Sequence, residues 1–138
     1  YEGTNGIQAM DLEARKMMDG GAAAFKLMDD ITDLASTSSS ELADAVLTSV
    51  TELRVTTEWL LNRDLNDRFA GAVAYQKAFA RVLGGYFHLI SAMSGDGKRI
   101  RIANFYINSL LPEYTSLCSQ ARVGSENLYA LELDDFAA

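Results

Sequence analysis

The chain has 138 residues, of which 49% are hydrophobic and one is proline, so it can bury one compact core and is expected to form one domain built from helices. The net charge of −7 argues against a nucleic-acid partner, which would need a basic stripe that the 12 Lys and Arg do not form. The only cysteine, Cys118, allows no internal disulfide or zinc cluster, which favours a reducing, cytoplasmic setting. No apolar run approaches the roughly 20 residues that span a bilayer.

The predicted elements begin with a helix from about Asn5 to Met18. Thr4 and Asn5 can each cap it, because their side-chain oxygens accept from the free N–H groups of a first helical turn. Glu2 therefore places a carboxylate directly before a helix start. Taken alone, this glutamate is most simply a solvated surface residue. The chain opens on Tyr1 without a signal-peptide pattern, which we interpret as a fragment of a longer polypeptide.

A second, shorter helix is predicted from about Ala22 to Ala35, after Gly20-Gly21. Ser38 and Glu41 have the spacing of a capping box, so a helix of about six turns is expected to begin there and to end at Asn62-Arg63-Asp64. Apolar residues recur at helical spacing in both segments. They are Phe25, Met28, Ile31 and Leu34 in the first, and Leu42, Val46, Ser49 or Val50, Leu53, Thr57, Leu60 and Leu61 in the second.

Two further long helices follow. The first runs from about Leu65 to Met93, and its interior glycines predict close approach of a neighbouring helix, because each costs about 1 kcal/mol relative to alanine. The second runs from about Lys98 to Val123, and Pro112 is expected to kink it because proline lacks an N–H. Gly124 is a candidate C-cap. The glycines of the first helix are Gly71, Gly84 and Gly85. The apolar side of the first helix carries Phe69, Val73, Phe79, Leu83, Tyr86 or Phe87 and Ile90. The apolar side of the second carries Ile100, Ala103, Ile107, Leu110, Tyr114 and Leu117.

The last segment, residues 125–138, carries four carboxylates and no positive charge. Five large apolar or aromatic residues make it too apolar for a purely solvated tail, so we expect it to dock on the bundle or on a partner surface; they are Leu128, Tyr129, Leu131, Leu133 and Phe136. Taken together, the elements predict an all-α fold, an antiparallel helical bundle of about five helices with an acidic C-terminal tail.

Several groupings could be taken for sites. Asp29, Asp30 and Asp33 have the spacing of a magnesium-binding motif, but one motif supplies too few carboxylates for a phosphate site, so a solvated helix face is preferred. His88 is the only histidine, which excludes a diiron bundle on ligand count and favours a packed side chain. Cys118 is most simply a small buried residue. Three cations at the start of the last long helix either bind an anion or are surface charges; they are Lys98, Arg99 and Arg101.

Three stretches of the chain resemble acyl-CoA dehydrogenases. Tyr1-Glu2-Gly3-Thr4-Asn5-Gly6-Ile7-Gln8, with the helix that follows, is similar to the segment that carries the catalytic base in these enzymes. Residues 68–85 and 101–112, which include AGAVAY, RVLGG and IANFY, resemble the C-terminal extension of the larger bacterial members. The similarity covers most of the chain, but only the first eight residues are specific enough to carry chemistry.

This resemblance implies dehydrogenation of an acyl-CoA thioester to the trans-2-enoyl-CoA, with FAD as the cofactor and no metal. Glu2 is the implied base for the α-proton, because a carboxylate accepts a proton without competing as a strong nucleophile. Gly3, Thr4, Asn5 and Gly6 occupy the positions that contact the cofactor in relatives, although many shorter relatives have a glutamine in place of Gly6. The implied partners are the acyl-CoA substrate, an electron-transferring flavoprotein and further copies of the full-length chain, as a dimer or tetramer.

The same resemblance divides the chain into the end of a dehydrogenase core at residues 1–20, a helical bundle at 21–124 and the acidic tail at 125–138. The rest of the flavin and acyl pocket would precede Tyr1, so the isolated chain is expected to be colourless and inactive. A competing hypothesis is a non-enzymatic helical module for docking or oligomerisation, in which Glu2 is an accidental surface residue. The sequence that precedes Tyr1 would discriminate between the two.

Overall fold

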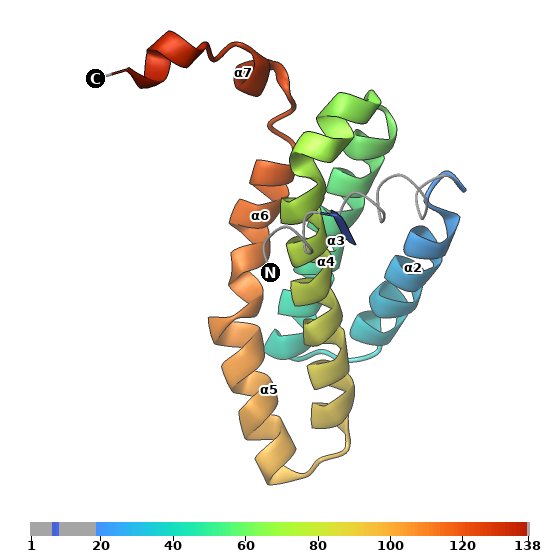
Figure 1. Cartoon of the computed structure of the whole chain (residues 1–138). Helices are drawn as coiled ribbons and strands as arrows, with labels where there is room; N and C mark the ends of the chain where they lie inside the picture. Colours follow the sequence, from blue (N-terminus) through green and yellow to red (C-terminus); the bar gives the residue numbers. More distant parts are fainter. Residues whose placement is uncertain (1–6, 9–18, 138) are drawn as a thin grey trace.

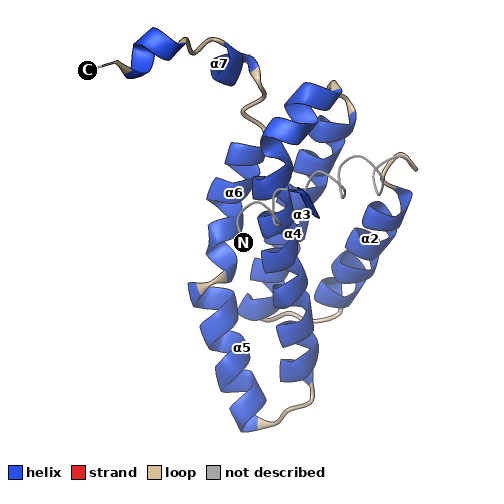
Figure 2. Ribbon diagram, viewed as in Figure 1, coloured by secondary structure: helices blue, strands red, loops and turns tan. Residues whose placement is uncertain are grey.

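The computed structural model describes residues 7–8 and 19–137, and within these residues the fold is all-α, without a strand (Figure 2). Five helices pack together, which confirms the predicted fold class; they are α2 (Ala22–Ser36), α3 (Glu41–Leu61), α4 (Leu65–Met93), α5 (Gly97–Ser109) and α6 (Tyr114–Ala121). The 3₁₀ turn η2 (Leu111–Glu113) separates α5 from α6, and the tail forms α7 (Glu126–Tyr129) and η3 (Leu133–Phe136). None of the helices in residues 7–8 and 19–137 qualifies as a membrane span.

Short loops reverse the chain between successive long helices, so that α2, α3, α4 and the α5–α6 pair run alternately in opposite directions (Figure 1). Helix α4 packs against α3, α5 and α6, and α2 packs mainly against α3. Three polar side chains start the helices by accepting a hydrogen bond from a first-turn N–H. They are Ser40, Asp64 and Asp96, with distances of 3.1, 2.9 and 3.2 Å to the N–H groups of Ala43, Asp67 and Arg99.

The capping box predicted from Ser38 is wrong, although the helix starts where expected. Helix α3 begins at Glu41, and its cap is the preceding residue, Ser40, whose backbone is extended. The Ser38 hydroxyl instead donates to the Ser40 hydroxyl at 3.2 Å. Consecutive serines offer several possible caps, and the backbone conformation at the helix boundary selects one of them.

The core lies where α2, α3, α4 and the α5–α6 pair meet. Its largest fully buried side chains are Tyr75, Met28, Ile31, Leu53, Leu60, Ile107, Leu111, Val46, Val50 and Val82. Most positions predicted for the inner faces of α2, α3 and the last long segment are buried or half-buried, which confirms the periodicity argument there.

In α4, the face predicted from its large residues is not the one that is most buried. Phe69, Val73, Phe79 and Leu83 are half-buried, and Phe87 and Ile90 are exposed. The buried face consists largely of small residues and is made of Gly71, Ala72, Tyr75, Ala78, Val82, Gly85 and Leu89. Small residues allow neighbouring helices to approach the α4 axis closely, so the large residues are displaced to the margins of the contact.

The interior glycines confirm the predicted close approach. A β-carbon on Gly71 would lie 2.2 Å from the carbonyl oxygen of Ala121 in α6, and one on Gly84 would lie 2.1 Å from the Tyr106 hydroxyl in α5. A β-carbon on Gly85 would lie 3.2 Å from the Leu111 side chain. These glycines therefore set the distance between α4 and the α5–α6 pair.

Proline interrupts the last long segment more strongly than the predicted kink. Helix α5 ends at Ser109, η2 contains Pro112, and α6 starts at Tyr114. Pro112 has no N–H to donate to the carbonyl four residues earlier, so the α-helical hydrogen-bond pattern stops there. Helix α6 ends at Ala121, and Gly124, with a φ of 82°, lies beyond its C-cap residue Arg122.

The tail does not dock on the bundle of its own chain, which corrects one of the two predicted possibilities. It runs away from the end of α6 (Figure 1), and its apolar residues Leu128, Tyr129, Leu131, Leu133 and Phe136 are exposed. At its base, the N–H and hydroxyl of Ser125 both donate to Asp67 Oδ1 at 2.8 Å.

Candidate functional site

The site residues predicted from the sequence are Glu2, Gly3, Thr4, Asn5 and Gly6, and all of them lie outside the described residues. The base and its cofactor contacts therefore remain predictions. The described residues instead show how the bundle is held at its junctions and what chemistry its surfaces offer.

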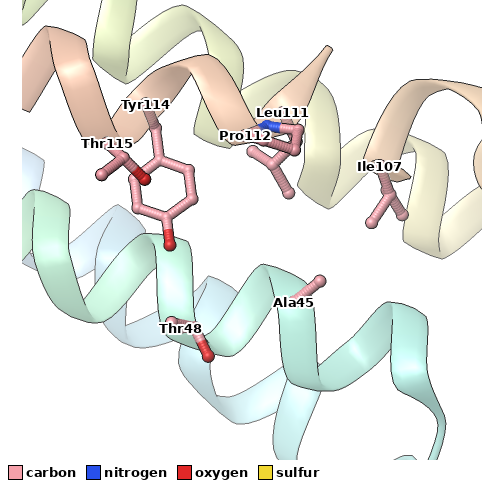
Figure 3. A pocket seen from close by; sticks show the side chains of 7 residues that line it. All are labelled: Ala45, Thr48, Ile107, Leu111, Pro112, Tyr114 and Thr115. Carbon is pink, nitrogen blue, oxygen red and sulfur yellow. The ribbon is translucent and has the colours of Figure 1, made fainter. Parts of the chain in front are cut away.

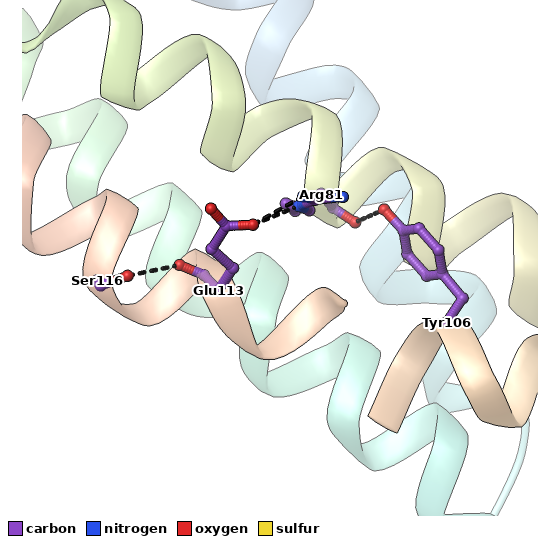
Figure 4. Close-up of polar contacts among 4 residues, drawn as sticks. All are labelled: Arg81, Tyr106, Glu113 and Ser116. Carbon is purple, nitrogen blue, oxygen red and sulfur yellow. Dashed lines mark hydrogen bonds and ion pairs between the residues drawn. The ribbon is translucent and has the colours of Figure 1, made fainter. Parts of the chain in front are cut away.

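The junction between α5 and α6 is tied to the middle of α4 by Arg81 (Figure 4). The Arg81 Nε donates to Glu113 Oε2 at 2.9 Å, and its Nη2 lies 2.7 Å from the same oxygen. The Tyr106 hydroxyl donates to the Arg81 carbonyl at 3.0 Å, and the Ser116 hydroxyl donates to the Glu113 carbonyl at 3.1 Å. The hydrogen bond to Glu113 raises the pKa of Arg81 above its usual value. This cation is therefore already neutralised by a carboxylate.

Tyr106 also contacts the histidine of α4. The rings of His88 and Tyr106 are stacked with centroids 4.5 Å apart, and His88 is half-buried. The absence of a β-carbon at Gly84 makes room for the Tyr106 hydroxyl. His88 is thus a packed residue at a helix contact, as predicted.

A cavity of about 240 Å³ lies beside η2, between α3 and the α5–α6 junction (Figure 3). Its lining contains the hydroxyl groups of Thr48, Tyr114 and Thr115 among apolar side chains; the other residues are Ala45, Ile107, Leu111 and Pro112. This lining provides no carboxylate, imidazole, thiol or amine, so the cavity has no acid, base or nucleophile suited to catalysis at neutral pH.

Two other cavities are lined by described residues, and neither suits a dinucleotide. One, of about 280 Å³, lies over Lys77, Arg81 and Glu113, and the other, of about 230 Å³, lies between the start of α3 and the end of α4. Sites for small molecules usually measure about 300–1,000 Å³. The bundle therefore shows no cofactor site in its described part.

The predicted aspartate face is a charged surface. Asp29 and Asp30 are exposed and form ion pairs with Arg54 and Lys26. Across the described residues, no group of three or more His, Cys, Asp or Glu could hold a metal ion. The magnesium alternative has no support in this part of the chain.

The polar groups inside the bundle have structural roles. The Thr57 and Tyr75 hydroxyls are 2.7 Å apart and join α3 to α4. Cys118 is fully buried, as predicted, and burial raises the pKa of its thiol. A buried thiol with a raised pKa carries little of the reactive thiolate.

Two arrangements were not predicted from the sequence. Arg68 closes the turn between α3 and α4, because its guanidinium donates to the carbonyls of Leu60, Leu61 and Arg63 at 2.8–3.1 Å. Asp67 holds the base of the tail through Ser125, and these hydrogen bonds lower the pKa of Asp67. No local pattern indicated the second contact, since its partners are 58 residues apart.

One comparison with known proteins found a match. A family model described as acetyl-CoA dehydrogenase C-terminal like covers residues 24–132. No curated protein and no solved structure matches the chain. The matched range extends from Ala24, the third residue of α2, to Glu132 in the tail. It includes α3 to α6 in full and all of α2 except its first two residues.

Proposed function

Because the chain belongs to the acetyl-CoA dehydrogenase C-terminal-like family, we propose that it is the C-terminal part of a flavin-dependent acyl-CoA dehydrogenase. The observation that carries this proposal is the family match over 24–132 of 138 residues. The segment Tyr1 to Gln8 supports it independently, because it resembles the base-bearing segment of these enzymes and lies outside the matched range.

In this proposal the reaction removes two hydrogens from an acyl-CoA thioester and gives the trans-2-enoyl-CoA. Glu2 takes the α-proton, and its backbone N–H helps to hold the thioester carbonyl, where negative charge develops. When bound, FAD supplies the acceptor for the β-hydrogen, which leaves as hydride. Gly3, Thr4, Asn5 and Gly6 would contact the cofactor, and an electron-transferring flavoprotein would receive the electrons.

The bundle has a supporting role in this enzyme. Its cavities contain no dinucleotide site and its junctions are closed by internal hydrogen bonds, as described above. Helices α2 to α6 therefore form an added domain that packs beside a catalytic core. That core supplies most of the contacts to the flavin and the acyl chain.

Replacing Glu2 in the intact dehydrogenase tests the assignment directly. Glu2→Gln removes the basic carboxylate while keeping the size of the side chain, so α-proton exchange and turnover should fall by at least about a hundredfold, with the flavin still bound. Glu58→Gln is the matched control, because Glu58 is an exposed residue of α3, and its activity should equal that of the unmodified enzyme. Turnover that survives Glu2→Gln would place the base elsewhere.

The isolated 138-residue chain gives a second test. After incubation with FAD and removal of the free cofactor, it should show none of the visible absorbance of a bound flavin. A bound, reducible flavin on this chain would contradict the proposed division between core and bundle.

A second candidate function is a helical docking or oligomerisation module without chemistry. The observation that favours it is the set of exposed large apolar residues on the tail, α4 and α5. An intact protein that contains this bundle but binds no flavin and oxidises no acyl-CoA would support the module and refute the enzyme.

A further inference from the structure

The tail presents an acidic and apolar surface that is held in a defined shape. We name it the tail surface; it consists of Leu131, Leu133, Asp134, Asp135 and Phe136. Leu133 is 90% exposed and Phe136 73% exposed. Its turn is fixed by a reciprocal cap, in which the Glu132 side chain accepts from the Asp135 N–H and the Asp135 side chain accepts from the Glu132 N–H at 2.8 Å. Exposed apolar side chains on an ordered turn indicate a binding surface.

The outer side of α5 matches the tail surface, because it offers cations for the carboxylates of the tail and apolar side chains for its apolar side chains. We name it the α5 surface; it consists of Lys98, Arg99, Arg101, Ile102 and Phe105. Phe105 is 64% exposed and Ile102 is 46% exposed. Lys98, Ile102 and Phe105 follow one another at intervals of four and three residues, which places them on one side of the helix.

The charges of this surface are free to meet a partner. Within the described residues, none of its three cations forms a salt bridge. Asp96 is the only carboxylate in residues 94–112, and it caps the start of α5 by accepting from the Arg99 N–H. The α5 surface is therefore locally positive on a chain whose net charge is −7.

The two surfaces lie at opposite ends of the same molecule (Figure 1). The tail surface does not pack on the α5 surface of its own chain, because Leu133 is 90% exposed and Phe136 is 73% exposed. The tail leaves the chain at the end of α6, whereas the α5 surface lies at the other end of the α5–α6 pair.

We propose that the tail of one chain docks on the α5 surface of a second copy, so that two antiparallel chains exchange tails. A two-fold axis then places both tails against both α5 surfaces, and the contact closes on a dimer. Asp134 and Asp135 face Lys98, Arg99 and Arg101, while Leu133 and Phe136 cover Ile102 and Phe105. This proposal concerns only the bundle and its tail, and it does not depend on the flavin chemistry.

Charge reversal on each surface tests the proposal. Sedimentation velocity of the 138-residue chain at 1–100 µM should show a dimer that dissociates more readily as salt is raised from 0.05 to 0.5 M. Over this range the Debye length falls from roughly 14 to 4 Å, so the attraction between the two charged surfaces is screened. Lys98→Glu should weaken the dimer at least about tenfold, and so should Asp134→Lys, which leaves the cap between Glu132 and Asp135 intact. Both positions are exposed, and circular dichroism should report an unchanged fold.

Combining the two reversals is the decisive step. A chain that carries both changes has opposite charges at these two positions again, with the signs exchanged, and should regain most of the dimer. Lys77→Glu is the matched control, because Lys77 is exposed and lies outside both surfaces, and it should leave association unchanged. A chain that is monomeric at 100 µM, or a dimer that neither reversal weakens, would overturn the proposal.

Discussion

Replacing Gly71 with alanine should destabilise the bundle, although alanine is the better helix former. Gly71 lies in α4 where α6 crosses it, and the nearest atom to an added β-carbon would be the Ala121 carbonyl oxygen at 2.2 Å, with the Ala121 Cα at 3.1 Å. These are backbone atoms, so no side chain can rotate to make room. The two helices would have to move apart, which would loosen a core that contains Tyr75, Cys118 and Ala121.

The expected size follows from two opposing effects. Alanine in place of glycine favours an exposed helix interior by about 1 kcal/mol. Overpacking a close contact costs about 1–3 kcal/mol, and occasionally more. With a separation of 2.2 Å from a backbone oxygen, the cost should lie at the upper end of that range. The net loss for Gly71→Ala should therefore be about 2 kcal/mol, equivalent to a Tm lower by roughly 5–10 °C for a chain of this size.

Urea and thermal denaturation followed by circular dichroism measure this loss of stability. The same substitution at two other glycines gives the values with which it is compared. Gly97→Ala is the control, because the nearest atom to its β-carbon is the end of the Arg101 side chain at 3.5 Å, so stability should be unchanged or slightly higher. Gly84→Ala should fall between the two, since the atom it meets is the Tyr106 hydroxyl, which can move if it gives up its hydrogen bond to Arg81. A Gly71→Ala protein as stable as Gly97→Ala would refute the close contact between α4 and α6.

Three further predictions each concern one residue. Leu53→Ala, in the core, should lower the free energy of unfolding by about 2–5 kcal/mol, as measured by urea denaturation. Val55 is 45% exposed on the same helix, so Val55→Ala should change this free energy by no more than about 0.5 kcal/mol. Equal losses for the two variants would contradict the assigned core. Because its hydrogen bonds to Ser125 lower the pKa of Asp67, their stabilisation should be complete above the ordinary aspartate pKa of about 3.9 and lost as the pH falls below it. The protection of the Ser125 amide from hydrogen exchange, relative to the intrinsic exchange rate at each pH, should show this loss, and in Asp67→Asn this protection should no longer change over the same pH range. Cys118 should react with a disulfide reagent at pH 8 only after unfolding, since burial raises its pKa; rapid labelling of the folded chain would show that the thiol is accessible.

Local patterns were enough to predict α2, α3 and α4 and their main boundaries. The helix predicted from Asn5 to Met18 lies, apart from residues 7–8, outside the described residues and stays a prediction. The spacing of Met28 and Ile31, or of Val46, Val50 and Leu53, depends only on the helical repeat, and these residues are buried as that repeat requires. Pro112 also acts locally, because its missing N–H interrupts the α-helical hydrogen-bond pattern at its own position. The resemblance to acyl-CoA dehydrogenases came from the sequence as well, and the family match supports it at the level of the domain. The assignment of Glu2 as the base stays a prediction.

The tertiary structure decided which neighbours each helix has, and this changed three conclusions. In α4 the small residues face the core and the large ones lie at its margins, because the contact with α6 at Gly71 leaves no space for a side chain. The cap of α3 is Ser40 rather than Ser38, because the path of the loop sets where the helix begins. The tail projects from the bundle, held by Asp67 at a residue 58 positions away. Sequence periodicity reports the environment of a residue along its own helix, whereas these outcomes depend on distances between segments that are far apart in the chain.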